Sequence, residues 1–215
     1  MDKAFIFDMD GTLFDTETLT KEAVRAVSHK YGEREDIDEF YPTTCGLTVE
    51  KAEELYHKFY GETYPFYERR NEVRQWMKNS IETNGIPIKE GAKELLEHLK
   101  DKGYKIALAT SATRASAEGH IRKADFEKYF DVSVCGDEIA NSKPHPEIFL
   151  TAAKKLGISP EKCFVAEDSY LGVESGVAAG MKVFMIPDIN PPREQEKDTA
   201  YKICNSLLEV IDYIK

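Results

Sequence analysis

Apolar positions along the chain fall into two alternating patterns. Short, mostly apolar runs occupy 4–7, 105–109, 131–134, 163–166 and 183–186. Runs of this kind are typical of strands that are covered on both faces. Between them, apolar residues recur at helical spacing over 90–102, 114–129, 146–156, 173–179 and 206–213. Strands that alternate with helices predict an α/β fold, with a parallel sheet and right-handed crossovers.

Glycines and prolines mark where these segments end. Gly103, Gly157 and Gly180 directly follow three of the predicted helices, where glycine is a typical C-terminal cap. The stretch 188–198 is polar and carries prolines, so we interpret it as a loop.

Residues 16–84 interrupt the alternation. They carry helical patterns at 17–31, 49–60 and 65–81 and no convincing buried strand. We therefore predict that residues 1–15 and 85–215 form a Rossmann-like core with helices on both faces of the sheet. Residues 16–84 would form a small all-helical domain inserted after the first strand.

The composition narrows the class of protein. The chain has 215 residues, 41% of them hydrophobic, and a formal net charge of −10. Such a chain lacks the basic field that binds nucleic-acid phosphates, and no apolar run approaches the roughly 20 residues of a membrane span. The four cysteines form no C-x-x-C pair, which favours a reducing compartment. We expect a cytoplasmic monomer that binds neither nucleic acid nor membrane.

Polar side chains gather where the predicted strands end. In an open parallel sheet, ligands bind beyond the carboxyl ends of the strands. The polar residues that follow these ends are Asp8, Asp10, Thr110, Ser111, Lys143, Glu167 and Asp168. They are up to 160 positions apart in the sequence, yet the topology predicts that they meet at one rim.

Crowded carboxylates need a counter-charge. Two of them about 4 Å apart repel by roughly 1 kcal/mol in water and about 4 kcal/mol at an effective dielectric of 20. A set of oxygen donors suits a hard cation, and Mg²⁺ typically shares its shell with waters and substrate phosphate oxygens. Gly11 permits a close backbone approach, and Lys143 offers a compact positive charge to phosphate. The rim therefore predicts a site for Mg²⁺ and a phosphoryl group.

Four ordered motifs carry a resemblance to a known family. They are "DMDGT" at 8–12, "LATSA" at 108–112, "NSKPHPEIF" at 141–149 and "VAEDS" at 165–169. Together they resemble the motifs of the haloacid dehalogenase superfamily, in particular its Mg²⁺-dependent phosphatases and its β-phosphoglucomutase-like branch. That branch inserts its helical cap where residues 16–84 lie.

The resemblance implies a role for each rim residue. Asp8 would attack phosphorus and become an aspartyl phosphate, while Asp10 would protonate the leaving group and later activate water. Mg²⁺ would be held by Asp8, the backbone carbonyl of Asp10 and Asp168, with Glu167 either a direct ligand or an orienting group. Gly11, Thr110, Ser111 and Lys143 would contact the phosphoryl group. The substrate would be a small phosphorylated metabolite, such as a sugar or polyol phosphate.

A phosphomutase is the main alternative. As the resemblance has it, sugar-phosphate mutases carry a histidine early in the first cap helix and basic residues on a cap loop. The corresponding positions here are Thr20, Cys45 and Val49, so we favour hydrolysis. A non-catalytic binding relative and a dehalogenase remain weaker alternatives.

The cap positions offer candidates for substrate specificity. By position we name Thr20, Cys45 and Thr48, whose small side chains suit a sugar or polyol. The cationic residues at 69, 70, 74 and 78 are spaced as one helix face among glutamates, and we interpret them as solvated and ion-paired. Thr110 could instead serve as a helix N-cap.

Overall fold

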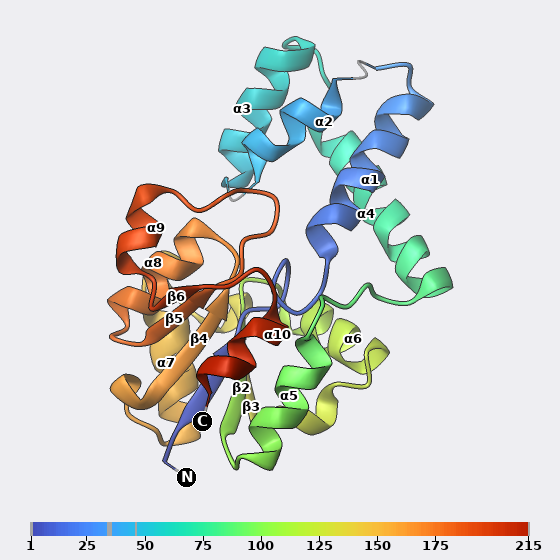
Figure 1. Ribbon diagram of the computed structural model, residues 1–215. Helices are drawn as coiled ribbons and strands as arrows, with labels where there is room; N and C mark the ends of the chain where they lie inside the picture. Colours follow the sequence, from blue (N-terminus) through green and yellow to red (C-terminus); the bar gives the residue numbers. More distant parts are fainter. Residues whose placement is uncertain (1, 34–35, 46, 215) are drawn as a thin grey trace. The chain divides into compact units, whose positions relative to one another are not determined.

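The computed structural model describes residues 2–33, 36–45 and 47–214 (Figure 1). The chain divides into two compact units, one formed by residues 1–15 and 88–215 and the other by residues 16–87. The first is an α/β unit that contains the predicted rim. The second is built from helices throughout its described part.

The described residues of the α/β unit form a parallel sheet in the order β3-β2-β1-β4-β5-β6. Its strands are β1 (Ala4–Phe7), β2 (Lys105–Thr110), β3 (Val132–Cys135), β4 (Cys163–Glu167), β5 (Lys182–Met185) and β6 (Lys202–Ile203). Its helices are α5 (Ala92–Asp101), α6 (Arg114–Lys123), α7 (Glu147–Leu156), α8 (Tyr170–Ala178), α9 (Glu194–Thr199) and α10 (Leu207–Val210). The predicted fold class is confirmed.

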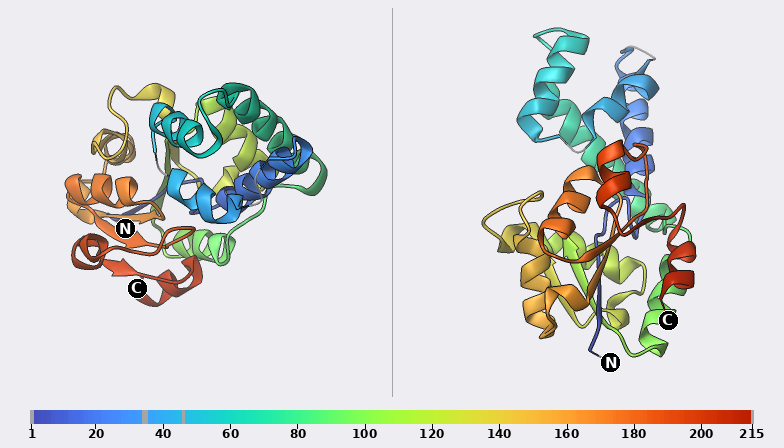
Figure 2. Two further views of the ribbon diagram at one scale, coloured as in Figure 1. Left: turned by 90° about the horizontal axis from the view of Figure 1, so that it is seen from above. Right: turned by 60° about the vertical axis from the view of Figure 1, so that its left-hand side comes forward.

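The side chains of β1 explain why helices cover both faces. Ala4 and Ile6 point to one face and pack into a buried cluster with Phe149 of α7 and Val173 of α8. Phe5 points to the other face, where its ring stacks 6.0 Å from that of Phe184. Figure 2 shows α7 and α8 on one side of the sheet and α5 and α10 on the other. A strand buried on both sides cannot alternate polar and apolar residues, as its sequence indicates.

Several segments of the α/β unit differ from the prediction, and three of them have a clear local reason. The helix predicted over 114–129 ends at Lys123, because Asp125 takes a left-handed conformation with φ of 58°. The prediction of a loop over 188–198 is wrong from residue 194, where α9 begins. This helix is capped by Glu196, whose carboxylate accepts hydrogen bonds from the Arg193 backbone N–H and guanidinium. Strand β6 has two residues, too few for a pattern to reveal.

The helical unit has an aromatic interior of its own. Its helices are α1 (Thr16–Lys30), α2 (Ile37–Phe40), α3 (Val49–Tyr60) and α4 (Phe66–Asn84). The Phe40 ring of α2 stacks 4.0 Å from that of Phe59 in α3 and meets that of Tyr56 edge-on at 4.9 Å. In the described parts of the chain, no helix combines the length and the apolar content that a membrane span requires.

Gly91 is a close-contact point between α5 and α10. It has φ of 80°, and a Cβ there would lie 2.2 Å from the Leu208 backbone nitrogen. Gly103 is a matched control, with φ of 74° and open space around the same position. We predict that Gly103→Ala costs about 1 kcal/mol, the usual left-handed penalty, and that Gly91→Ala costs at least about 2 kcal/mol more. Urea unfolding measures both, and equal costs would contradict the close contact.

Candidate active site

The candidate site lies at the carboxyl ends of β1, β2 and β4. Phe7, the last residue of β1, pairs with Leu108 of β2 and Ala166 of β4. Asp8 follows directly and its backbone N–H donates to the Ala166 carbonyl oxygen at 3.0 Å. In the sheet, β2 lies on one side of β1 and β4 lies on the other. The carboxyl end of β1 is therefore a topological switch point, where open parallel sheets bind their ligands.

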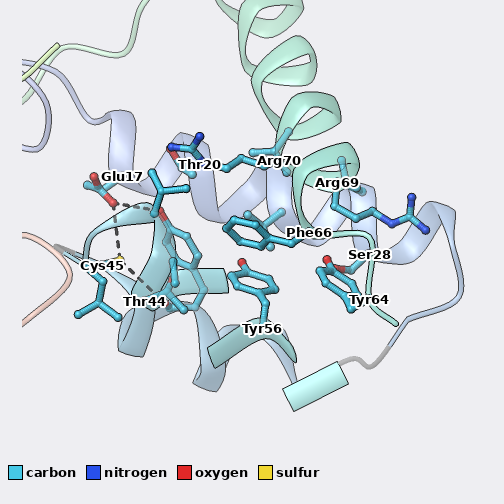
Figure 3. A pocket seen from close by; sticks show the side chains of 17 residues that line it. Glu17, Thr20, Ser28, Thr44, Cys45, Tyr56, Tyr64, Phe66, Arg69 and Arg70 are labelled. Carbon is cyan, nitrogen blue, oxygen red and sulfur yellow. Dashed lines mark hydrogen bonds between the residues drawn. The ribbon is translucent and has the colours of Figure 1, made fainter. Parts of the chain in front are cut away.

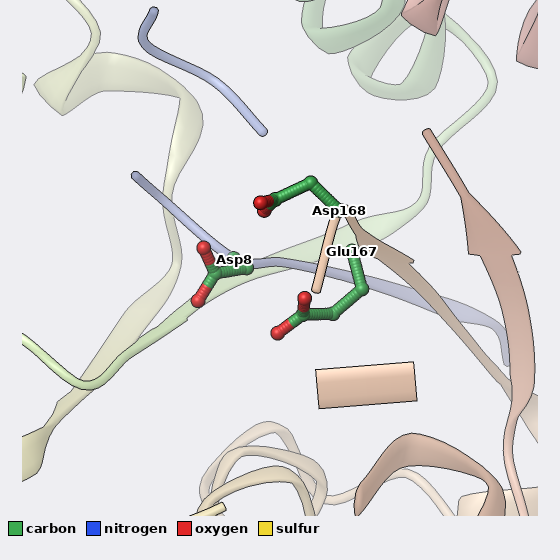
Figure 4. A group of neighbouring side chains, drawn as sticks. All are labelled: Asp8, Glu167 and Asp168. Atoms are coloured by element: carbon green, nitrogen blue, oxygen red, sulfur yellow. The ribbon is translucent and has the colours of Figure 1, made fainter. Parts of the chain in front are cut away.

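Three carboxylates meet at this point. In the described residues, Asp8, Glu167 and Asp168 each offer an oxygen that lies within 4.8 Å of the other two (Figure 4). Burial raises the pKa of Asp8 to about 7; Lys143 opposes the shift, and the charge of Glu167 adds to it. Burial raises the pKa of Asp168 well above its ordinary value, and the charges of Glu167 and Asp8 add to the effect. The cluster is therefore short of positive charge.

Lys143 supplies part of that charge. Its Nζ donates to Asp8 Oδ1 at 2.5 Å, to Glu167 Oε1 at 2.6 Å and to the Ala109 carbonyl oxygen at 3.3 Å. Its side chain is 7% exposed. Burial disfavours the ammonium form, yet the charges of Asp8 and Glu167 outweigh it and raise the pKa of Lys143. An ammonium so placed stays protonated and can offset negative charge on a neighbouring oxyanion.

Glu167 is the most constrained of the three carboxylates. Its Oε2 accepts hydrogen bonds from the Ser169 backbone N–H and hydroxyl, each at 3.0 Å, while Oε1 accepts from Lys143. A Cβ at Gly172 would lie 1.8 Å from this carboxyl group, so only glycine fits there in α8. These contacts fit an orienting group better than a direct ligand.

Asp168 is held by the first motif. The Thr12 hydroxyl donates to Asp168 Oδ1 at 2.7 Å across 156 positions of sequence. A Cβ at Gly11, which has φ of 83°, would lie 2.4 Å from Asp168 Oδ2. The glycine of "DMDGT" therefore serves both the turn and the close approach of this carboxylate. Thr12 is a positioning residue, which the sequence analysis contains in the first motif but does not count among the site residues.

Asp10 differs from the simplest expectation. The sequence predicts that Asp10 meets the other polar residues at the rim, but the carboxylate cluster among the described residues contains Asp8 and not Asp10. Asp10 Oδ1 instead lies 4.0 Å from His120 Nδ1 of α6. The chain has already left β1 there and turns at Gly11, so the strand alternation no longer applies. The pKa of His120 lies below its ordinary value because the side chain is largely buried, although the charge of Asp10 opposes this shift.

Thr110 and Ser111 begin the loop after β2. The Thr110 side chain is buried, and its Oγ1 accepts from the Ala112 backbone N–H at 3.1 Å. It is not the N-cap of α6, because Thr113 caps that helix by accepting from the Ser116 backbone N–H. Ser111 is exposed. A Cβ at Gly136 would lie 2.2 Å from the Ser111 carbonyl oxygen, so the loop after β3 packs closely against this one.

The helical unit contains a pocket of about 240 Å³ (Figure 3). Thr20 and Cys45 line it, as do Glu17 and four aromatic residues, Tyr41, Tyr56, Tyr64 and Phe66. The Glu17 carboxylate accepts from the Tyr41 hydroxyl at 3.0 Å and lies 3.7 Å from Cys45 Sγ. Thr48 is not part of the lining; its side chain caps α3 by accepting from the Lys51 backbone N–H.

The cationic face of α4 divides into two kinds of side chain. Arg69 is ion-paired as expected: its Nε donates to Glu33 at 2.7 Å, and its guanidinium lies 3.3 Å from the Tyr31 ring centroid. Arg70 lines the pocket and extends toward Thr20 (Figure 3). Among the described residues, no carboxylate is within ion-pair distance of it. Burial, and then the charge of Arg74, lower the pKa of Arg70.

Known proteins resemble this chain over nearly its whole length. A phosphorylated carbohydrates phosphatase of Thermotoga maritima is 40% identical over 185 residues, which cover 84% of this chain and 82% of the relative. Fructose-1-phosphate phosphatase YqaB of Escherichia coli is 31% identical over 179 residues, covering 82% and 92%. The crystal structure of a Thermotoga maritima protein assigned as a β-phosphoglucomutase has a TM-score of 0.81 at 32% identity, covering 99% and 100%.

The family match coincides with the motifs. The family described as haloacid dehalogenase-like hydrolase matches residues 5–186, from β1 to the residue after β5. This span contains all four motifs and the helical unit, so the resemblance drawn from the motifs is confirmed. The chain belongs to the family of haloacid dehalogenase-like hydrolases.

Proposed function

We propose that this hydrolase is a Mg²⁺-dependent phosphatase that acts on a sugar or polyol phosphate and passes the phosphoryl group through Asp8. The observation that supports it most is the contact of the Lys143 ammonium with both Asp8 and Glu167 beside Asp168. The names of two relatives, a phosphorylated carbohydrates phosphatase and a fructose-1-phosphate phosphatase, favour the substrate class. A cytoplasmic, monomeric state remains our expectation.

The donor set fits Mg²⁺. The three clustered groups are all carboxylates, and Mg²⁺ prefers oxygen donors in a shell shared with substrate phosphate. Asp8 and Asp168 would hold the ion, with the Asp10 carbonyl as a further donor and Glu167 as an orienting group. When bound, the ion would offset charge on the phosphoryl oxygens.

The chain's own residues supply the remaining chemistry. An Asp8 carboxylate oxygen attacks phosphorus, the bond from phosphorus to the leaving oxygen breaks, and Asp10 gives that oxygen its proton. In the second step water attacks the phosphorus and passes a proton to Asp10, while the bond from phosphorus to the Asp8 oxygen breaks. Inorganic phosphate leaves, and the Asp8 carboxylate is restored. Lys143 and Thr110 would hold the phosphoryl oxygens, with Gly11 and Ser111 as neighbouring backbone contacts.

We propose that the helical unit is the cap and that the residues lining its pocket contribute to the choice of substrate. The pocket offers a donor in Arg70, an acceptor in Glu17 and aromatic walls. A polyhydroxylated ligand can use all three, because its hydroxyls both donate and accept and its C–H faces pack on rings. Thr20 and Cys45 line the same pocket, which supports their assignment to specificity; that of Thr48 stays a prediction from position.

The mutase alternative has one supporting observation, the similarity to a structure assigned as a β-phosphoglucomutase. Against it, Thr20, Cys45 and Val49 line the pocket where those mutases, by the family resemblance, carry a histidine and basic residues. Interconversion of a sugar 1-phosphate and its 6-phosphate, stimulated by a bisphosphate, would establish the mutase and overturn hydrolysis as the main activity.

Removal of the nucleophile is the first test. We predict that Asp8→Asn lowers kcat about 10⁴-fold or more on any phosphate ester that the wild type hydrolyses, as loss of other nucleophiles does. Its thermal midpoint should not fall, because the change removes one of three mutually repelling charges. Asp101→Asn, at an exposed position on α5, serves as the control. Full turnover by Asp8→Asn would contradict the proposed chemistry.

The raised pKa of Asp8 predicts a pH-dependent effect of Mg²⁺. Between pH 4 and about 7, native Asp8 holds a proton that the unfolded chain has released, so this group lowers stability as pH rises. Above pH 7 the ionised carboxylates bind Mg²⁺ more strongly. Saturating Mg²⁺ should therefore raise the melting temperature by about 5 °C or more at pH 8 and by much less at pH 5. Thermal melts at matched ionic strength measure this, and equal shifts would contradict it.

Arg70 tests the assignment of the pocket. We predict that Arg70→Gln raises KM for a sugar phosphate about tenfold, the value of one hydrogen bond to a charged group. Hydrolysis of acetyl phosphate, whose small leaving group does not fill such a pocket, should change less than about twofold. Arg74→Gln, one turn along α4 and exposed, is the matched control. Equal effects of the two substitutions would exclude a role for the pocket in substrate binding.

A further inference from the structure

His120 lies beside the carboxylate that the proposed function uses as its acid and base. His120 is in α6, the helix that follows β2, and its Nδ1 is 4.0 Å from Asp10 Oδ1. The His120 side chain is 20% exposed and that of Asp10 is 36% exposed. The contact therefore lies at the margin of the site, between the buried cluster and the surface.

The ring nitrogen that faces Asp10 is buried. Within the described residues, His120 Nδ1 has no hydrogen-bond partner. A buried polar atom without a hydrogen-bond partner lowers the stability of the fold, so such an atom often has a functional role. An approach of about 1 Å by either side chain would bring Nδ1 and the Asp10 carboxylate to hydrogen-bond distance.

Packing fixes the orientation of the ring. The His120 ring meets the Phe14 ring edge-on, at 6.1 Å and 85°. Phe14 is itself buried and stacks on Phe126 at 5.9 Å. Its carbonyl oxygen accepts from the Gly11 backbone N–H at 2.8 Å, within the turn that carries Asp10. The histidine and the aspartate are thus held by one local framework.

We propose that His120 is a positioning residue that orients the Asp10 carboxyl group toward the leaving-group oxygen. The inference rests on the proposed phosphatase function. In the first step Asp10 transfers its proton to the leaving oxygen as the bond from phosphorus to that oxygen breaks and the bond to Asp8 forms. His120 exchanges no proton with substrate; it limits the rotation of the group that does. Orientation of an acid is worth a measurable part of its 10²–10⁴-fold contribution to rate, about tenfold here.

Leaving groups that differ in basicity separate this role from a structural one. Acetate departs from acetyl phosphate without needing a proton, whereas the alkoxide of a sugar phosphate needs one. The ratio kcat/KM reports events up to the first irreversible step, which is the phosphoryl transfer to Asp8. A defect in the acid should therefore lower kcat/KM for the sugar phosphate alone, and a defect in folding should lower it for both.

The test compares three substitutions on fructose 1-phosphate and acetyl phosphate, with Mg²⁺ present. His120→Phe keeps the ring contact with Phe14 and removes the nitrogen. It should lower kcat/KM about tenfold for fructose 1-phosphate and less than about twofold for acetyl phosphate. His120→Asn places an amide near the position of Nδ1 and should recover most of the loss. His98→Gln, on α5, is the control and should match the wild type.

An Asp10→Asn background gives a second readout. If His120 acts through Asp10, His120→Phe adds no further loss once the acid is absent. Equal losses on both esters, or an unchanged ratio between them, would overturn the inference while leaving the phosphatase proposal intact. If the wild type hydrolyses neither ester, the proposed function itself fails, and this inference fails with it.

Discussion

The ammonium of Lys143 is the contact on which the acidic centre depends. It comes from the loop after β3 and reaches Asp8 after β1 and Glu167 at the end of β4. Without it, three carboxylates would share a buried space with no positive charge among the described side chains that contact them. Each pair would then repel by several kcal/mol at the dielectric typical of such sites. Burial is the main reason that the pKa of Asp8 is raised to about 7, and the charge of Glu167 adds to the shift, so part of the repulsion remains.

This residual repulsion connects the fold to the chemistry. A rigid parallel sheet can hold groups that would separate if they lay on flexible segments, and the β1–β4 pairing does so here. Gly11 and Gly172 allow the carboxylates to approach the backbone closely. The protein therefore keeps a site that is short of positive charge, in which a divalent cation and a lysine can act together on a phosphoryl group. The repulsion among the carboxylates lowers the stability of the fold, and the binding of a cation at the same place would raise it again.

Much of the fold and of the rim could be predicted from the sequence because both depend on regular patterns. Buried runs such as Ala4–Phe7 identified the strands, and parallel topology brought Asp8 and Asp168 together from opposite ends of the chain. What escaped prediction depends on individual contacts. The capping of α9 by Glu196 has no periodic signature, and a two-residue strand such as β6 falls below the length at which a pattern exists.

The side chains around the rim illustrate the same limit. The D-x-D spacing does not reveal that Asp10 faces His120, because the turn after β1 breaks the strand alternation. Arg69 and Arg70 are neighbours in one cationic run and both line the pocket, yet only the structure shows that Arg69 is paired with Glu33. Thr12 could have been singled out as the hydroxyl of the first motif, but its partner Asp168 lies 156 positions away.

The central claim is that Asp8 accepts the phosphoryl group at this rim. The Asp10→Asn variant offers the most direct measurement, because it should still accept phosphate from acetyl phosphate but lack the base that activates water. Acid quenching during this reaction, followed by borohydride reduction and peptide mass spectrometry, locates the acyl phosphate. The account predicts that Asp8 is reduced to homoserine. A phosphoryl group on another residue, or an unmodified Asp8 while acetyl phosphate is consumed, would contradict it.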